Sequence, residues 1–203
     1  MAASHGTLEL DKLLPATFTA PGLSEAEFLD LAAKFPDATV EYTSDGTVIL
    51  MAPTDPDSGA PVHEVGRQLD RWQEKLGKGR VSGPDVGFRF KDGSRRAPDA
   101  AWFDEDRWRE AKKSLKSGYR FPVFAPDFVI EVRSPDDRIR TLREKMEEYI
   151  ANGVQLAWLI DPQERTVAIY RPGREPEILK NPKTVAGDGP VAGFVLTLDQ
   201  VFA

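Results

Sequence analysis

The chain has 203 residues, of which 40% are hydrophobic and 30% charged, a size and composition typical of one globular domain with a buried core. Its net charge of −6 excludes a global positive field for nucleic acid, and no apolar run reaches the roughly 20 residues that span a bilayer. It contains no cysteine, only His5 and His63 as histidines, and no secretory pattern at its N-terminus, so we expect a cytoplasmic protein whose metal ligands, if any, are carboxylates.

The first third of the chain predicts an arm, a helix and a hairpin. Residues 1–21 carry little pattern, so we expect an N-terminal arm followed by one domain at 22–203. Ser24 and Glu27 form a capping box that starts a helix. A Ser-Asp-Gly turn signal then predicts a hairpin between residues 37–42 and 47–51.

A second helix is predicted after a loop at residues 52–61. The apolar residues that follow recur at helical spacing, and Gly77 should end the helix. These apolar residues are Val62, Val65, Leu69, Trp72 and Leu76. His63 and Glu64 lie in its first turn, where they are either solvated or near a site.

Two acids accompany the next pair of predicted strands, 81–90 and 96–103, which are joined by a turn at 91–94. Asp99 is an acid inside an otherwise apolar strand, and Asp85 on the partner strand is its rival. Residues 104–126 read as a charged, partly helical insertion. Its basic residues form either a local surface for DNA or a solvated face; they are Arg107, Arg109, Lys112, Lys113, Lys116 and Arg120.

The stretch 128–149 predicts a buried strand followed at once by a helix. Glu131 interrupts the strand, and a buried carboxylate is costly unless a proton, cation or metal compensates it. Ser134 is the expected N-cap, and one apolar stripe follows it: Ile139, Leu142, Met146, Tyr149 and Ile150. Lys145 borders the stripe and could lean toward the sheet face that carries Glu131.

The C-terminal part predicts strands at 156–160 and 166–170, a surface loop at 172–193 and an edge strand at 194–198. The strand-helix-strand unit from 128 to 160 should have parallel strands. The expected fold is therefore α/β, with a mixed β-sheet flanked by helices.

Asp99, Glu131 and Lys145 together predict a metal-assisted hydrolase. Two carboxylates that share Mg²⁺ or Mn²⁺ relieve each other's repulsion, and a lysine can stabilise developing charge. A structural ion pair of Glu131 with Arg133 or Lys145 is the alternative. The sequence contains no phosphate-binding loop and no nucleophile elbow. A glycosidase, which needs only two carboxylates, is not excluded by residue type.

The segments APDAAWF and PDFVIEVRSPDDRIRTLREKMEEYIANGVQLAWLIDPQERTVAIYRPG resemble the Uma-two family, which belongs to the PD-(D/E)XK nuclease superfamily. The segments SEAEFLDL, DGTVILMAPT and HEVGRQLDRW agree, so the resemblance covers roughly residues 22–202. It implies a restriction-endonuclease-like fold and a Mg²⁺- or Mn²⁺-dependent endonuclease acting on nucleic acid, with DNA the expected partner.

The resemblance also assigns residues. It implies that Asp99 and Glu131 bind the metal and that Lys145 is the lysine, because Arg133 occupies the superfamily's usual lysine position. It also implies a further acid near the metal, either Glu41 or Glu64. The alternative function is a non-catalytic interaction or nucleic-acid-binding module. Three apolar residues near the C-terminus suggest a homodimer: Phe194, Val195 and Phe202.

Overall fold

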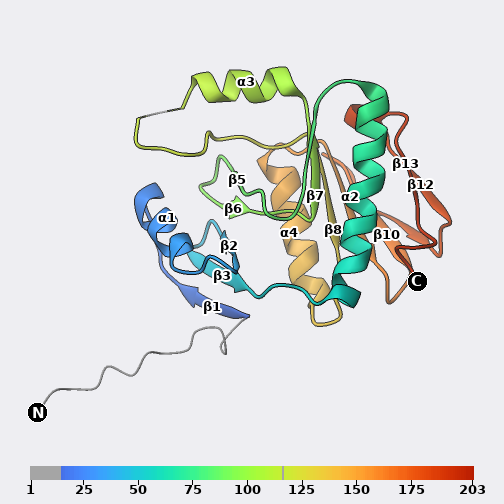
Figure 1. Cartoon of the computed structure of the whole chain (residues 1–203), viewed down its shortest axis with the longest axis horizontal. Coiled ribbons are helices and arrows are strands. Elements are labelled where there is room, and N and C mark those ends of the chain that lie inside the picture. The colour runs from blue at the N-terminus through green and yellow to red at the C-terminus, as the bar shows by residue number, and fades with distance from the viewer. Residues whose placement is uncertain (1–14, 116) are drawn as a thin grey trace, which may run out of the picture.

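The computed structural model describes residues 15–115 and 117–203 and confirms the predicted α/β class, with mixed sheets flanked by helices (Figure 1). Residues 1–14 of the expected arm and Lys116 lie outside the described part. The helices are α1 (Glu25–Ala33), α2 (Pro56–Leu76), α3 (Glu105–Lys113) and α4 (Ile139–Asn152). The strands of the central sheet are β4 (Arg80–Ser82), β7 (Ala100–Phe103), β8 (Phe128–Val132), β9 (Leu156–Asp161), β10 (Thr166–Tyr170) and β11 (Glu177–Lys180). The others are β1 (Ala16–Thr19), β2 (Thr39–Tyr42), β3 (Thr47–Met51), β5 (Phe88–Arg89), β6 (Arg95–Arg96), β12 (Thr184–Ala186) and β13 (Val195–Thr197).

The central sheet has the order β11-β10-β9-β8-β7-β4, and the predicted parallel pairing of β8 with β9 through α4 is confirmed. Its two faces carry separate cores because side chains alternate along each strand. Phe128 and Ile130 pack with Val65 of α2, while Val129 packs with Met146 of α4. Glu131 therefore belongs to the face that α4 covers.

A second sheet, β1-β3-β2-β6-β5, supports α1 and lies beside the central sheet (Figure 1). The capping box of Ser24 and Glu27 and the hairpin β2–β3 are confirmed. Strand β1 lies within the expected arm and pairs with β3. The small core of this lobe consists of Phe28, Tyr42, Val48 and Leu50.

Two predicted helix starts are wrong. Helix α2 begins at Pro56, inside the expected loop at 52–61, because Asp55 caps it by accepting hydrogen bonds from the backbone N–H groups of Asp57 and Ser58. Helix α4 begins after Arg138 and has no side-chain cap. Ser134 instead forms a separate turn, in which Asp137 Oδ2 accepts from its backbone N–H and its hydroxyl.

The strands predicted at 81–90 and 96–103 are each divided between the two sheets. Strand β4 pairs with β7 in the central sheet, whereas β5 pairs with β6 in the second sheet across the predicted turn at 91–94. The breaks occur at Gly83–Gly87 and at Ala97–Asp99, where the chain passes from one sheet to the other.

The segment 172–193 is wrongly predicted as a loop, since it contains β11 and β12. Strand β11 extends the central sheet, while β12 pairs with β13. Phe194 and Phe202 are buried in the chain's own core, so of the three residues that suggested a homodimer only Val195 is exposed. None of the described helices combines the length and apolar character needed to cross a membrane.

Candidate active site

Asp99 and Glu131 face each other across two neighbouring antiparallel strands. Ala100 pairs with Ile130, so one further step in register brings Asp99, which immediately precedes β7, opposite Glu131 of β8. Residues opposite each other in antiparallel strands share one face of the sheet. The backbone N–H of Val132 donates to Asp99 Oδ2 at 2.7 Å and fixes the carboxylate. The expected position of Asp99 within the strand is therefore wrong, since Asp99 immediately precedes β7.

Lys145 reaches Glu131 from α4, which covers this face. Its Nζ atom lies 2.9 Å from Oε1 and 3.0 Å from Oε2 of Glu131. The hydroxyl of Tyr149, one turn further along α4, donates to Oε1 at 2.7 Å. Glu131 and Lys145 are 4% and 9% exposed, so both charges are removed from bulk water.

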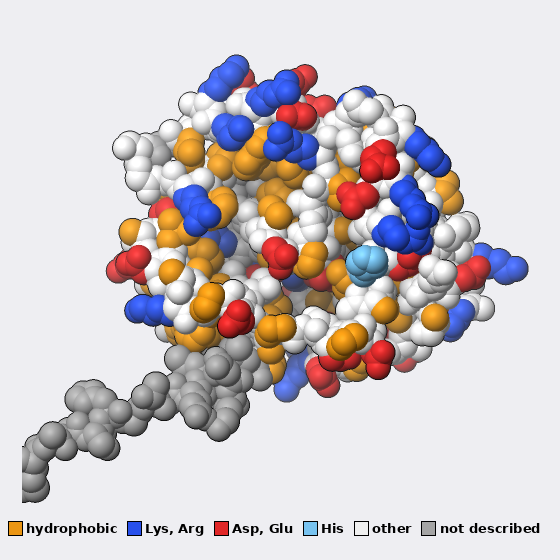
Figure 2. Space-filling model, in the orientation of Figure 1, with side chains coloured by type: hydrophobic (Ala, Val, Ile, Leu, Met, Phe, Trp, Pro, Cys, Tyr) orange, Lys and Arg blue, Asp and Glu red, His pale blue; other side chains and the backbone are white. Residues whose placement is uncertain are grey.

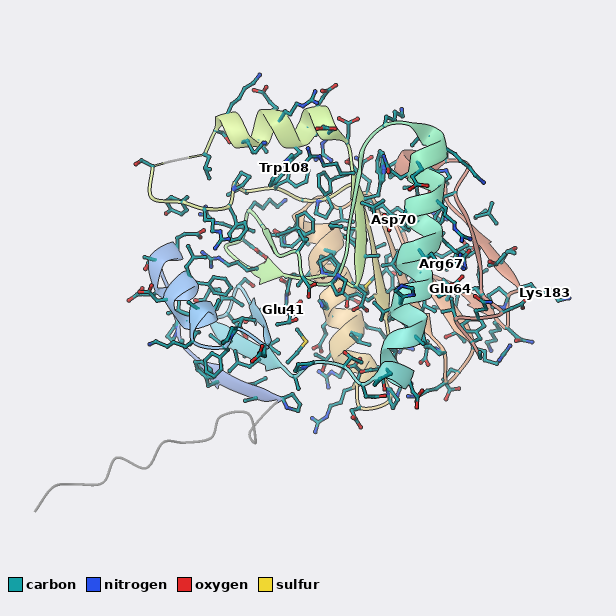
Figure 3. The ribbon with its side chains drawn as sticks, in the orientation of Figure 1. Glu41, Glu64, Arg67, Asp70, Trp108 and Lys183 are labelled. Atoms are coloured by element: carbon teal, nitrogen blue, oxygen red, sulfur yellow. The ribbon has the colours of Figure 1, made fainter. Side chains whose placement is uncertain are left out.

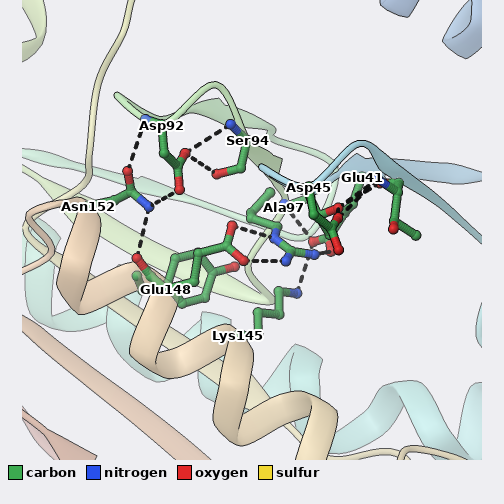
Figure 4. A network of polar contacts seen from close by, with 12 residues as sticks. Glu41, Asp45, Asp92, Ser94, Ala97, Lys145, Glu148 and Asn152 are labelled. Atoms are coloured by element: carbon green, nitrogen blue, oxygen red, sulfur yellow. Dashed lines mark hydrogen bonds and ion pairs between the residues drawn. The ribbon is translucent and has the colours of Figure 1, made fainter. Parts of the chain in front are cut away.

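Glu41 lies on β2 of the second sheet and reaches this cluster through Lys145. Its Oε1 atom lies 2.9 Å from Lys145 Nζ and accepts the backbone N–H of Ala97 at 2.8 Å. Its Oε2 accepts from Arg96 Nη1 at 3.0 Å, and Arg96 also pairs with Glu148. Figure 4 shows this network between the second sheet and α4.

Burial raises the pKa of all three carboxylates of this cluster, and the charges and hydrogen bonds around each one decide the outcome. Burial, together with the charge of Asp99, raises the pKa of Glu131 to about 8 against the opposing charge of Lys145. Burial also raises the pKa of Asp99 to about 6, although its bond from Val132 acts in the other direction. For Glu41 the charges of Lys145 and Arg96 outweigh burial, so its pKa is lowered. Burial lowers the pKa of Lys145, but the charges of Glu131 and Glu41 outweigh burial and raise it. Glu41 is therefore the natural anionic partner of Lys145, and Glu131 is the carboxylate that most needs an additional cation.

The remaining candidate residues lie elsewhere. Arg133 follows β8 and pairs with Asp161 at 2.8 Å. Glu64 is buried against Arg67 and Gln68 on α2, the helix that covers the opposite face; Figure 3 shows Glu41 and Glu64 on separate elements. His63 is exposed on the same helix, and Asp85 is exposed in the connection between β4 and β5.

The basic surface predicted between residues 107 and 120 is largely paired within the chain. Arg107 pairs with Asp127, Arg109 with Glu105, and Lys113 with Glu110. Lys112 lies over the Trp108 ring, and Lys116 is outside the described residues. The solvated-face interpretation fits most of α3.

The donor set suits a hard divalent cation held in part by substrate. Mg²⁺ is commonly held by one or two carboxylates together with water and substrate phosphates. Asp99 and Glu131 provide two carboxylates, and Asp99 Oδ1 accepts no hydrogen bond within the described chain. The described residues contain no cluster of three or more His, Cys, Asp or Glu side chains arranged around one ion position. The fit therefore depends on two protein ligands.

Three members of the network were not predicted from sequence as polar partners: Arg96, Glu148 and Tyr149. Tyr149 was assigned to the apolar stripe, and its position one turn after Lys145 was the available signal. Arg96 and Glu148 carried none, because opposite charges on distant segments do not reveal that they meet.

Comparison with known proteins identifies a nuclease-related fold. A family model described as "Uma2: Putative restriction endonuclease" matches residues 25–199. The crystal structure of "a putative nuclease belonging to DUF820" from Anabaena variabilis superimposes with a TM-score of 0.69 and 24% sequence identity, covering 86% of this chain and 97% of that one. At this identity the likeness shows the fold. Comparison with curated proteins gives no match.

Proposed function

This chain belongs to the Uma2 (Uma-two) family, whose description is "Putative restriction endonuclease", and we propose that it is an endonuclease that hydrolyses phosphodiester bonds of nucleic acid, with DNA as the expected substrate. The observation that carries the proposal is the meeting of Asp99, Glu131 and Lys145 on one face of the central sheet. Glu131 lies on β8 and Asp99 immediately precedes β7, so rigid neighbouring strands support both carboxylates in this proposal.

Asp99 and Glu131 are the proposed ligands of Mg²⁺ or Mn²⁺. When bound, such an ion lowers the pKa of a coordinated water and neutralises charge on the phosphate. The bond from Val132 holds Oδ2 of Asp99, while Oδ1 accepts no hydrogen bond from the described residues and is available to an ion.

Lys145 is proposed to act on the substrate's phosphate or on the attacking water. Its buried ammonium is held between Glu41 and Glu131, and Arg96 in turn anchors Glu41. A cation held in place before the reaction stabilises developing negative charge without reorganisation at that moment. Glu41 and Arg96 are positioning residues in this scheme, because they act through Lys145.

The test is cleavage of labelled single- and double-stranded DNA and RNA by purified protein with Mg²⁺ or Mn²⁺. Wild type should cut at least one substrate only when the metal is present, and Asp99→Ala should cut none. Asp70→Ala is the matched control, because that aspartate is exposed on α2, the helix that covers the opposite face of the sheet. Wild-type protein that cuts none of the substrates with either metal would rule the proposal out.

A non-catalytic module is the second candidate, and one observation favours it. The charges of Glu41, Lys145 and Glu131 are already paired with one another, as in a structural ion-pair network. Such a module would bind nucleic acid or a partner without metal-dependent cleavage. The same assay separates the two candidates, provided that binding is measured beside cleavage.

A further inference from the structure

A pocket of about 370 Å³ lies beside the candidate active site, between α1 and the strands β5 and β6. This volume is in the range of small-ligand sites, which is about 300–1,000 Å³. One wall is apolar and includes Phe28, Leu29 and Ala32 of α1, with Phe88 of β5 opposite. In Figure 2 the surface is hollowed between the α1 lobe and α3, with hydrophobic side chains inside and basic ones around it.

Arginine side chains give the pocket a positive rim. Arg95 and Arg96 also line it, but each already pairs with carboxylates. Arg89 and Arg120 form no ion pair with any residue in the described part of the chain. Their guanidinium groups lie 4.4 Å from the centre of the Tyr119 ring and 5.6 Å from that of Phe121, respectively.

The guanidinium groups of Arg89 and Arg120 and the apolar wall of the pocket fit different parts of one kind of ligand. A guanidinium group matches the geometry of a phosphate, and aromatic faces stack on nucleobases of any sequence. The lining residues include one acid, Asp85, against four arginines: Arg89, Arg95, Arg96 and Arg120. The pocket is therefore suited to a group that is anionic at one end and flat and apolar at the other.

The pocket shares a wall with the candidate active site. Arg96 and Ala97 both line the pocket, and both donate to Glu41, at 3.0 Å and 2.8 Å. Glu41 in turn pairs with Lys145. A nucleotide in the pocket would thus lie one residue layer from the lysine that is proposed to act on phosphate.

We propose that this pocket receives an unpaired nucleotide of the substrate, with its base against the apolar wall and its phosphate against Arg89 and Arg120. The proposal rests on the nuclease function for the reaction that the pocket serves. Bases in a duplex are stacked and paired, and removing one from the stack costs energy. The pocket therefore favours single-stranded or locally unpaired nucleic acid over intact duplex.

The test measures binding without cleavage. Wild-type protein in EDTA is titrated into fluorescein-labelled single-stranded DNA, single-stranded RNA and duplex DNA, and fluorescence anisotropy gives each Kd. Either single strand should bind about tenfold tighter than the duplex, the scale of one stacked base. Ala32→Trp fills the pocket and should remove this preference. Ala33→Trp, an exposed neighbour on the same helix that does not line the pocket, should keep it.

If Ala32→Trp does not fold, a second variant tests the proposal. Arg89→Ala with Arg120→Ala should weaken single-strand binding and reduce its salt dependence. Arg140→Ala with Arg174→Ala is the charge-matched control on exposed positions. Equal binding of duplex and single strands, or equal losses in test and control variants, would overturn the proposal. If single strands bind as expected but wild type cuts nothing with metal, the nuclease function fails while the pocket stands. If wild type cuts with metal but binds single strands no tighter than duplex, the nuclease function stands and the pocket proposal fails.

Discussion

Lys145 and Glu131, 14 residues apart in the chain, form a buried ion pair with 2.9 Å between Nζ and Oε1. The pair joins α4 to β8 on the face where Asp99 stands opposite Glu131. Arg133, two residues after Glu131, pairs with Asp161 instead. Because Lys145 and Arg133 pair with different acids, the role of each can be tested by its own substitution.

Lys145→Ala should lower the rate of metal-dependent cleavage by about 10²- to 10³-fold, the usual cost of removing one transition-state donor. Arg133→Ala is the matched control and should stay within a few-fold of wild type. Both variants are compared below their melting temperatures, because each leaves a buried carboxylate without its cation. An inactive Arg133→Ala beside an active Lys145→Ala would reverse the assignment.

Mn²⁺ should raise the melting temperature of wild type, because an ion that binds only the folded state stabilises it. The effect should disappear in Glu131→Gln, which removes one proposed ligand. Glu64→Gln changes a buried acid on α2, the helix covering the opposite face, and should keep the metal response. Differential scanning calorimetry with and without Mn²⁺ measures this, and the same shift in all three proteins would place the ion elsewhere.

Glu41→Gln should reduce the free energy of unfolding by about 3 kcal/mol, because removing one member of a buried ion pair leaves its partners uncompensated. Here the partners are Lys145 and Arg96. Glu144→Gln breaks an exposed pair with Arg140 and should cost less than about 1 kcal/mol. Urea denaturation of the metal-free proteins gives both values, and similar losses would mean that the Glu41 network contributes little.

Gly79→Ala should destabilise the chain by about 1–3 kcal/mol more than Gly173→Ala, the range for overpacking a filled site. Both glycines have positive φ, at +73° and +69°, so their backbone strain is matched. A Cβ at Gly79 would lie 2.5 Å from Cε2 of Trp102, whereas one at Gly173 meets nothing within 4 Å. Equal melting temperatures of the two variants would show that Trp102 moves aside freely.

A homodimer stays a prediction, and it now rests on fewer exposed apolar residues than the sequence suggested. Val195 is 52% exposed on β13, and Ile178 is 49% exposed on the edge strand β11. Exposed sheet edges can pair with a second chain, and a lysine there discourages it. Light scattering at micromolar concentration should give about twice the 22.5 kDa of one chain, and Ile178→Lys should reduce it. A mass near 22.5 kDa for wild type would contradict the dimer.

Local patterns predicted most elements of the fold. The alternation of apolar residues, the Ser24 capping box and the turns of two hairpins depend on residues close in sequence, so they were visible without a structure. The acid in the strand 128–132 and the lysine bordering the α4 stripe were visible for the same reason.

Tertiary structure decided what depends on distant partners. The strands predicted at 81–90 and 96–103 divide between two sheets because hydrogen-bond partners, rather than local composition, determine which sheet a strand enters. Glu41 and Glu64 were equal candidates from sequence, yet only Glu41 meets Lys145. The reason is physical: a charge's partner is set by which faces pack together, and side-chain periodicity gives the face of one element without saying which other element covers it.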